Sequence, residues 1–325
     1  MKHLIYFVLS SVVVAPAFAD NWQTPLLPWG APDLQGVWSN ETLTPFERPT
    51  NQANKAFFTA EEARALAERK IAALQRDAAP VEPNDEAPPK GANVGAYNLG
   101  WLDNGSAVAS TGRTSQVIDP PNGRVPVRKE AVAARDASAS ASYNDPEYMS
   151  VWDRCITRGI PGSMFPAGYN NYYRIFQQED AVLIYYEMIH EARVIPLDDS
   201  PRLDIKSWNG QPRGHWENDT LVVETMGFND QGWIANSFSQ GRIKGIKSTE
   251  NLKVVERFRR IDADTIIWQA RISDPSIYTS DWTVELPMEA RTGSKIFEYA
   301  CHEGNQAVGN ILRGARVQAN LAAGD

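Results

Sequence analysis

The feature that most constrains the fold is a series of strand patterns in the second half of the chain, several of them joined by short turn signals. The turns Glu179-Asp180, Asn218-Asp219 and Asp262-Ala263-Asp264 are typical of β-hairpins. No helical pattern separates these strands, which excludes a parallel sheet with helical crossovers. Such a series, of about eight to ten strands, predicts an antiparallel meander that closes into a barrel. The expected strands are 172–178, 181–189, 191–197, 215–217, 220–225, 252–261, 265–273, 282–288 and 295–301.

The first half of the chain predicts helices and loops inserted into this barrel. Thr59 and Glu62 form a capping box at the start of a helix over 59–76. Prolines and acidic residues at 77–90 indicate a linker or solvated loop. We therefore expect an N-terminal extension at 20–32 and one β-barrel domain at 33–325, with a helical and loop insertion at about 40–150. The other expected elements are short strands at 33–38 and 115–118 and helices at 129–141 and 306–323.

The first 19 residues have the pattern of a secretory signal peptide. Lys2 and His3 precede an apolar run at 4–14, and Ala17-Phe18-Ala19 is a small-x-small cleavage site. The run is too short to span a bilayer. The pattern predicts cleavage between Ala19 and Asp20, and a soluble periplasmic or extracellular protein without a membrane anchor.

The sequence contains two cysteines, Cys155 and Cys301. In an oxidising compartment an even pair favours a disulfide, whose loop closure contributes about 4–5 kcal/mol in the ideal case. A reactive thiol remains an alternative, because His302 directly follows Cys301. The disulfide would bring the loop at Asp153-Arg154 close to His302.

Composition restricts the partners of the chain. A net charge of −8 and a pI of about 5.2 exclude a protein that binds nucleic-acid backbones, which needs a basic face. The sequence has no Gly-rich phosphate loop and no Gly-x-Ser-x-Gly motif, so neither nucleotide binding nor a serine nucleophile is expected. The expected partner is a small-molecule ligand or substrate.

Two sets of residues resemble known proteins. Gly36 and Trp38 form a Gly-x-Trp sequence that resembles the opening of lipocalins and other calycins, and the hairpin series follows it. This resemblance implies a calycin-like barrel, although the long insertion between Trp38 and Trp152 departs from a compact lipocalin. Several stretches also resemble a largely uncharacterised family of secreted bacterial proteins, which implies no particular activity. These stretches are 33–38, 153–155, 169–171, 186–190, 214–217 and 299–305.

Histidine is scarce after the signal peptide, where it occurs at three positions. Imidazole is the general base nearest physiological pH and a common metal ligand. Strand alternation predicts that His190 shares a face with Tyr186, and that His215 and Glu217 share a face on which the carboxylate can orient the ring. A hydrogen-bonded core position for His190 and an exposed hairpin end for His215 are the structural alternatives. The catalytic candidates are His190, His302, His215, Glu217 and Glu187.

The three imidazoles come from separate expected strands, so a divalent metal held by His190, His215 and His302 is conceivable. The sequence contains no His-x-His or His-Glu-x-x-His spacing, and we therefore predict no cofactor.

Residues 153–173 form a long irregular segment rich in Gly, Pro, Asn and Tyr. Such segments often line a binding site, and the alternative is a plug in the barrel mouth held by backbone hydrogen bonds. The substrate-binding candidates are Arg154, Arg158, Asn170, Asn171, Tyr172 and, from the neighbouring strand, Tyr186.

These residues favour an enzyme that uses histidine and carboxylate acid–base chemistry on a small, largely apolar or ring-containing molecule in a barrel cavity. Because no redox cofactor motif is present, the expected classes are lyase, isomerase and hydrolase. The alternative is a non-catalytic, calycin-like carrier of a hydrophobic molecule, which would have an apolar interior. A protein-binding module would instead present a flat apolar patch.

Overall fold

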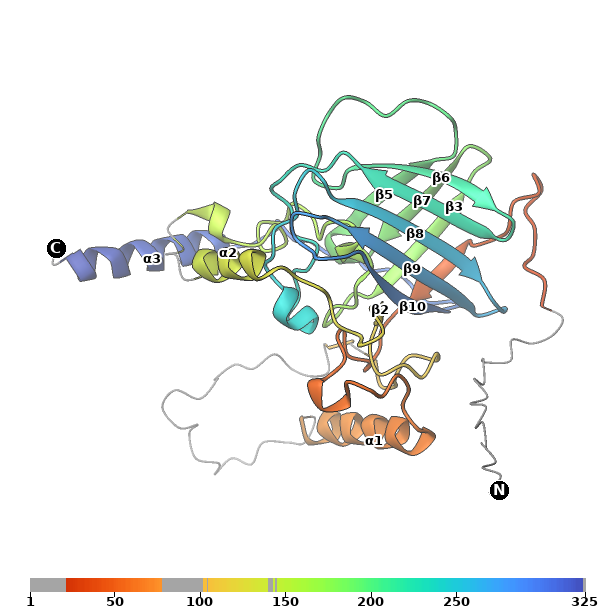
Figure 1. Ribbon diagram of the computed structural model, residues 1–325, viewed down its shortest axis with the longest axis horizontal. Coiled ribbons are helices and arrows are strands. Elements are labelled where there is room, and N and C mark those ends of the chain that lie inside the picture. The colour runs from red at the N-terminus through yellow and green to blue at the C-terminus, as the bar shows by residue number, and fades with distance from the viewer. Residues whose placement is uncertain (1–21, 78–101, 104, 140–142, 144, 324–325) are drawn as a thin grey trace, which may run out of the picture.

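The computed structural model describes residues 22–77, 102, 103, 105–139, 143 and 145–323 (Figure 1). The predicted signal peptide at 1–19 and all but the first residue of the linker at 77–90 lie outside the described residues.

An antiparallel sheet of ten strands forms the body of the described chain. β1 pairs with β3 on one side and with β10 on the other, so the sheet curls into a nearly closed barrel (Figure 1). The predicted meander barrel is therefore confirmed. In order around the barrel, the strands are β1 (Gly36–Ser39), β3 (Tyr172–Gln177), β4 (Ala181–Tyr186), β5 (Glu191–Pro196), β6 (Gln211–Glu217), β7 (Thr220–Met226), β8 (Lys253–Arg260), β9 (Thr265–Ser273) and β10 (Trp282–Ala290), with β2 (Val117–Asp119) paired to β10.

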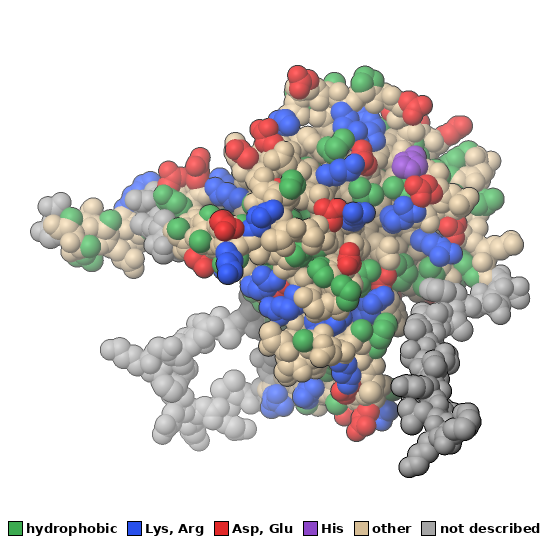
Figure 2. All heavy atoms as spheres, viewed as in Figure 1, with side chains coloured by type: hydrophobic (Ala, Val, Ile, Leu, Met, Phe, Trp, Pro, Cys, Tyr) green, Lys and Arg blue, Asp and Glu red, His purple; other side chains and the backbone are tan. Residues whose placement is uncertain are grey.

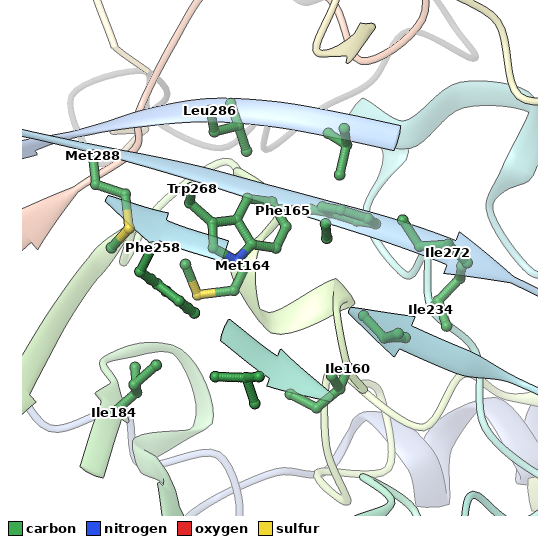
Figure 3. Close-up of a cluster of buried hydrophobic side chains, with 14 of the residues drawn as sticks. Ile160, Met164, Phe165, Ile184, Ile234, Phe258, Trp268, Ile272, Leu286 and Met288 are labelled. Atoms are coloured by element: carbon green, nitrogen blue, oxygen red, sulfur yellow. The ribbon is translucent and has the colours of Figure 1, made fainter. Parts of the chain in front are cut away.

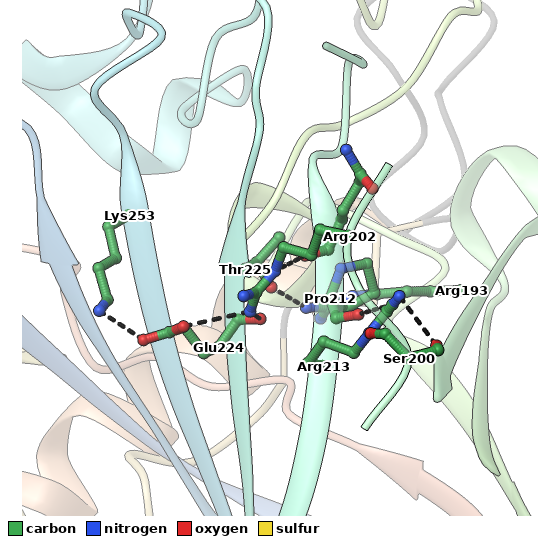
Figure 4. Close-up of polar contacts among 9 residues, drawn as sticks. Arg193, Ser200, Arg202, Pro212, Arg213, Glu224, Thr225 and Lys253 are labelled. Carbon is green, nitrogen blue, oxygen red and sulfur yellow. Dashed lines mark hydrogen bonds and ion pairs between the residues drawn. The ribbon is translucent and has the colours of Figure 1, made fainter. Parts of the chain in front are cut away.

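The barrel closes between β5 and β6 through side chains, because no backbone ladder joins these two strands among the described residues. Gly214 allows the close approach: a Cβ there would lie 2.8 Å from Leu197 Cδ2 and 2.9 Å from Ile195 Cγ2. Over the same seam, Arg213 Nε donates to the Ser200 carbonyl at 3.0 Å, and Arg202 Nη2 donates to the Glu224 carbonyl at 3.1 Å (Figure 4).

One end of the barrel is closed by residues 149–171, which we call the plug. Its backbone is held by its own hydrogen bonds, such as Ser163 N to Gly159 O at 2.7 Å, and it contains the short helix η4 (Gly162–Met164). The segment thus has the backbone hydrogen bonds that the plug alternative expected, and some of its residues also line a groove described below. The opposite end carries the hairpin turns at 178–180, 218–219 and 261–264, and we call it the turn end.

The barrel interior is packed with hydrocarbon. Met164 and Phe165 of the plug lie between the strands, close to Trp268 and Phe258 (Figure 3). The Phe165 and Trp268 rings meet edge to face with centroids 6.2 Å apart. We expected a ligand cavity inside the barrel, but plug side chains such as Met164 and Phe165 occupy that space.

A buried ion pair crosses this interior. Arg193 of β5 is 6% exposed and Glu256 of β8 is 0% exposed. Arg193 Nη2 lies 2.6 Å from Glu256 Oε2 and donates to Thr225 Oγ1 of β7 at 2.7 Å. Trp268 Nε1 donates to the other carboxylate oxygen at 3.2 Å. The pair ties β5 to β7 and β8 across the seam that lacks a ladder.

The predicted helices are present, with small shifts at their ends. The capping box of the first one is confirmed: Thr59 Oγ1 accepts from Glu62 N at 3.2 Å, and Glu62 Oε2 accepts from Thr59 N at 2.8 Å. The last helix projects from the plug end (Figure 1). Within the described ranges, no helix combines the length and apolar character needed to cross a bilayer. The helices are α1 (Ala60–Asp77), α2 (Lys129–Ala139) and α3 (Ala307–Ala323), with short 3-10 helices η1 (Thr50–Gln52), η3 (Pro146–Tyr148), η5 (Met188–His190) and η6 (Phe238–Ile243).

The predicted strand at 295–301 is wrong. β10 already pairs with β9 along one edge and with β1 and β2 along the other, so no edge remains for a following hairpin partner. Residues after Arg291 instead leave the sheet and return along the outside of the barrel to the plug end, where Phe297 N donates to Glu187 Oε1 at 2.9 Å.

Candidate functional site

The disulfide predicted between Cys155 and Cys301 is present, with a Cα–Cα distance of 5.8 Å. It joins the plug to the segment that precedes α3. This link brings the loop at Asp153 beside the chain around Cys301, the residue before His302, and Asp153 and Cys301 line the same groove.

We call this hollow the aromatic groove. It has a volume of about 460 Å³ and lies between the plug, residues 298–305 and the start of α3. Tyr169 and Tyr299 form a stacked pair with ring centroids 6.2 Å apart and an interplanar angle of 12°. Trp152 lies 6.5 Å from Tyr169, so three aromatic rings from two distant segments form one wall. The lining residues are Trp152, Asp153, Tyr169, Asn170, Glu298, Tyr299, Ala300, Cys301, Asn305, Ala307, Val308 and Ile311.

The charged side chains that line the aromatic groove are all carboxylates. Asp153 and Glu298 contribute carboxylates, and Asn170 and Asn305 contribute amides. The described residues that line the groove include no Lys, Arg or His. Such a lining suits a neutral or positively charged ligand with a flat ring, because rings stack on tyrosine and tryptophan faces and carboxylates accept hydrogen bonds.

A buried arginine lies behind this aromatic wall. The guanidinium carbon of Arg158 is 5.4 Å from the Trp152 ring, and Nη2 donates to the Phe165 carbonyl at 3.2 Å. Burial lowers the pKa of Arg158. Arg154 packs in a similar way over Trp208, at 6.0 Å. Both predicted binding arginines therefore support aromatic rings, and neither lines the groove.

Backbone strain concentrates at the plug end. Of the five described non-glycine residues with positive φ, four lie there: Cys155, Asn170, Ile189 and His190, with φ of 55°, 53°, 62° and 44°. A β-branched residue such as Ile189 rarely adopts this conformation. Such outliers persist only where surrounding structure enforces them, and they are found disproportionately at functional sites.

His190 lies in the strained turn between β4 and β5. The strand predicted to extend through 189 ends at Tyr186, and η5 follows. The expectation that His190 and Tyr186 share a strand face is therefore wrong. Its ring is exposed, and Nδ1 lies 2.7 Å from the Tyr299 carbonyl oxygen. Glu187 in the same turn is buried and accepts from Phe297 N. Both residues hold the segment that carries Tyr299.

The remaining catalytic candidates do not join His190 at one centre. His302 is exposed beyond the disulfide. His215 and Glu217 do contact each other, with Nε2 and Oε1 3.3 Å apart, but they lie near the turn end with side chains 59% and 45% exposed. Arg257 and then His215 lower the pKa of Glu217. Among the described residues no group of three or more His, Cys, Asp or Glu is placed to hold a metal ion, so the three imidazoles do not converge.

The other predicted binding residues have different positions. Asn170 lines the aromatic groove. Asn171 holds the plug together, since its Oδ1 accepts from Ala167 N at 2.7 Å. Tyr172 begins β3 and is half-buried. Tyr186 is buried inside the barrel near Arg193 and Glu256, and burial raises its pKa.

Sequence reasoning missed a carboxyl pair next to the plug. Burial, followed by a hydrogen bond with the Glu41 carboxyl, raises the pKa of Asp103 to about 7. Arg291 Nη2 lies 2.7 Å from Glu41 Oε1, and Asp103 N donates to the Gly168 carbonyl at 2.7 Å. Asp103 comes from the loop-rich insertion, where no periodic pattern marks it, so the sequence offered no signal for this pair.

Comparison of the chain with protein-family models, with curated proteins and with solved structures found no match. Its function must therefore be argued from the geometry of the plug end.

Proposed function

We propose that this protein is exported, binds a small ring-containing molecule in the aromatic groove, and acts on it by acid–base chemistry. The observation that carries the proposal is the stacked pair Tyr169 and Tyr299, with Trp152 beside it, in one groove with the carboxylates of Asp153 and Glu298. Strain in the surrounding backbone supports it, because Asn170 lines the groove and His190 contacts Tyr299.

In this proposal the ring of the ligand stacks on the tyrosine pair. The Asp153 carboxylate accepts hydrogen bonds from its polar substituents, and the Asn170 amide accepts or donates them. Glu298 accepts a proton from the bound molecule or returns one to it, which is the step shared by lyases, isomerases and hydrolases. His190 acts as a positioning residue, because its ring contacts the main chain of Tyr299.

Export is supported by the signal pattern at 1–19 and by the disulfide, which is typical of oxidising compartments. Mass spectrometry of the protein isolated from the periplasm or the medium should give an N-terminus at Asp20. Retention of an uncleaved chain in the cytoplasm would contradict this part of the proposal.

The binding step is tested by calorimetry with a panel of neutral and cationic ring compounds. Tyr299→Leu should weaken binding of any ligand found by about tenfold or more, because it removes one stacking face. Phe297→Leu is the matched control, since Phe297 is exposed two residues away and does not line the groove. Equal losses in both variants would refute the groove as the site.

The catalytic step is tested with the ligands that bind. Glu298→Gln should abolish turnover while leaving affinity within about threefold, because the amide keeps the shape but carries no exchangeable carboxyl proton. Glu303→Gln, an exposed carboxylate outside the groove lining, is the control. Binding without turnover in the unaltered protein would support a carrier instead of an enzyme.

A further inference from the structure

A second groove lies on the outer face of the barrel and shares no lining residue with the aromatic groove. It has a volume of about 650 Å³, within the usual range for small-molecule sites. Its floor consists of outward-facing side chains of β8, β9 and β10, and its outer wall consists of Phe57 and residues 110–113 of the insertion. We call it the arginine groove.

The outer wall is fixed in place. Phe57 and Arg113 form a β-bridge, and Phe58 N donates to Gly112 O at 2.9 Å. Arg113 Nε also donates to Glu285 Oε1 of β10 at 2.8 Å, which ties the wall to the floor. The groove is therefore a built feature of the insertion and the sheet together.

The charge of this groove is opposite to that of the aromatic groove. Arg113, Arg257 and Arg259 line it, against the carboxylates of Asp262 and Glu285. Both carboxylates already accept hydrogen bonds: Glu285 from Arg113 and from Gln269, and Asp262 from Asp264 N at 2.8 Å. The groove thus has a positive excess in a chain whose net charge is −8. Figure 2 shows Lys and Arg side chains along the boundary between the barrel and the segment that carries α1.

Two of the arginines have only weak competing partners. Arg257 pairs with Glu217 and Arg259 with Asp219, and neither of these carboxylates lines the groove. All four side chains are at least 42% exposed. Exposed pairs of this kind contribute about 0–1 kcal/mol, so an anion in the groove can compete for the guanidinium groups.

The same groove offers an apolar surface. Phe57 is 52% exposed, and the Arg113 guanidinium carbon lies 5.2 Å from the centroid of its ring. Ile261 and Ile267 contribute aliphatic surface from the turn and from β9. A ligand that matches both features has an anionic head and an apolar or aromatic body.

We propose that the arginine groove binds a small amphipathic anion, whose carboxylate, sulfonate or phosphate contacts Arg257 and Arg259 and whose apolar body packs against Phe57 and Ile267. This site is independent of the function proposed for the aromatic groove. The two differ in lining charge, and no lining residue is shared.

The test uses 8-anilinonaphthalene-1-sulfonate, an aromatic anion whose fluorescence rises on binding, with the full exported chain at about 50 mM NaCl. Arg257→Gln and Arg259→Gln should each raise its Kd about fivefold or more. Arg271→Gln is the matched control, because Arg271 is an exposed, ion-paired arginine of β9 that does not line the groove. Tyr299→Leu should leave the Kd unchanged, which separates this site from the aromatic groove.

Further measurements test the two halves of the ligand. N-phenyl-1-naphthylamine lacks the sulfonate and should bind about tenfold more weakly, and Phe57→Ala should weaken binding of the anionic probe. Competition by laurate, benzoate and inorganic phosphate distinguishes the head group from the body, and phosphate alone should compete poorly. Equal affinity for the neutral probe, or Kd values for Arg257→Gln and Arg259→Gln equal to that of Arg271→Gln, would overturn the proposal. Because the Arg257 and Arg259 side chains are exposed, neither variant should impair folding.

Discussion

The buried pair of Arg193 and Glu256 allows the most direct test of how this barrel is held closed. Replacing Glu256 with Gln removes the negative charge and leaves a guanidinium inside a hydrocarbon core. Burial by itself lowers the pKa of Arg193, but Glu256 and Tyr186 together outweigh burial and raise the pKa, so the charge stays on the guanidinium. Among the described residues, Arg193 Nε and Nη1 have no acceptor, which leaves Thr225 as its other partner.

The size of the effect follows from burial. Breaking a buried ion pair by removing one partner costs about 3–5 kcal/mol. We expect Glu256→Gln near the lower end, because the amide oxygen can still accept from Trp268 Nε1. With a urea m-value of about 3 kcal/mol/M for a chain of this size, the unfolding midpoint should fall by about 1 M.

The assay is equilibrium urea unfolding at neutral pH, followed by tryptophan fluorescence. Glu224→Gln is the matched control: Glu224 pairs with Lys253 and Arg202 on the outside of the barrel (Figure 4), where a pair contributes about 0–1 kcal/mol. The double variant Arg193→Met with Glu256→Leu should lose much less stability than the two single changes together, because no charge is left buried. A loss below about 1 kcal/mol for Glu256→Gln would refute the argument that this pair closes the seam.

Three other predictions concern the parts around this core. Replacing both Cys155 and Cys301 with serine should cost about 4–5 kcal/mol in urea unfolding, because the bridge closes a loop with a sequence separation of 146; stability equal to that of the reduced wild type is the internal check. Gly214→Ala should destabilise the protein by about 1–3 kcal/mol in the same assay, because the new Cβ would lie less than 3.0 Å from side-chain atoms of Leu197 and Ile195. Gly293→Ala is the control: a Cβ there has no neighbour within 4 Å, so this variant tests only the positive φ of its turn. The raised pKa of Asp103, about 7, means that the folded state holds a proton that the unfolded state has released, so the contribution of this group to stability falls as pH rises toward 7. Between about pH 5 and pH 8 the free energy of unfolding of the wild type should therefore fall by about 1–2 kcal/mol relative to that of Asp103→Asn, a figure reduced for the partial solvent exposure of Asp103. A difference between the two proteins that stays constant over this pH range would contradict the raised pKa.

The strands and helices could be predicted because their signals are local. Alternation, the Asn218-Asp219 turn and the Thr59 capping box each act within a few residues, and all three are present in the structure. The error at 295–301 has a different origin. Whether an alternating segment joins a sheet depends on a free edge. β1, about 250 residues earlier in the chain, already pairs with that edge of β10.

The prediction for His190 was wrong for a related reason. Its predicted face assumed that the strand continued, but Ile189 and His190 adopt positive φ without a glycine to signal the turn. The plug was also hard to place from sequence, because it contains the turn-forming residues of a loop. In the structure its Met164 and Phe165 side chains nevertheless pack into the barrel core together with side chains of the strands.

The aromatic groove shows which long-range information a single sequence can carry. Its lining comes from the plug, the segment around Tyr299 and the start of α3, and no periodic pattern relates these parts. The two cysteines are the exception, because a covalent bond between them can be inferred from their number and compartment alone. That inference predicted that the loop at Asp153-Arg154 lies close to His302, and in the structure Asp153 lines one groove with Cys301, the residue before His302. The carboxyl pair of Asp103 and Glu41 depends instead on a main-chain bond to Gly168 and on burial, neither of which residue types reveal. Where backbone contacts between irregular segments assemble a site, the sequence therefore predicts which residues meet only if a covalent link between those segments can itself be inferred from the sequence.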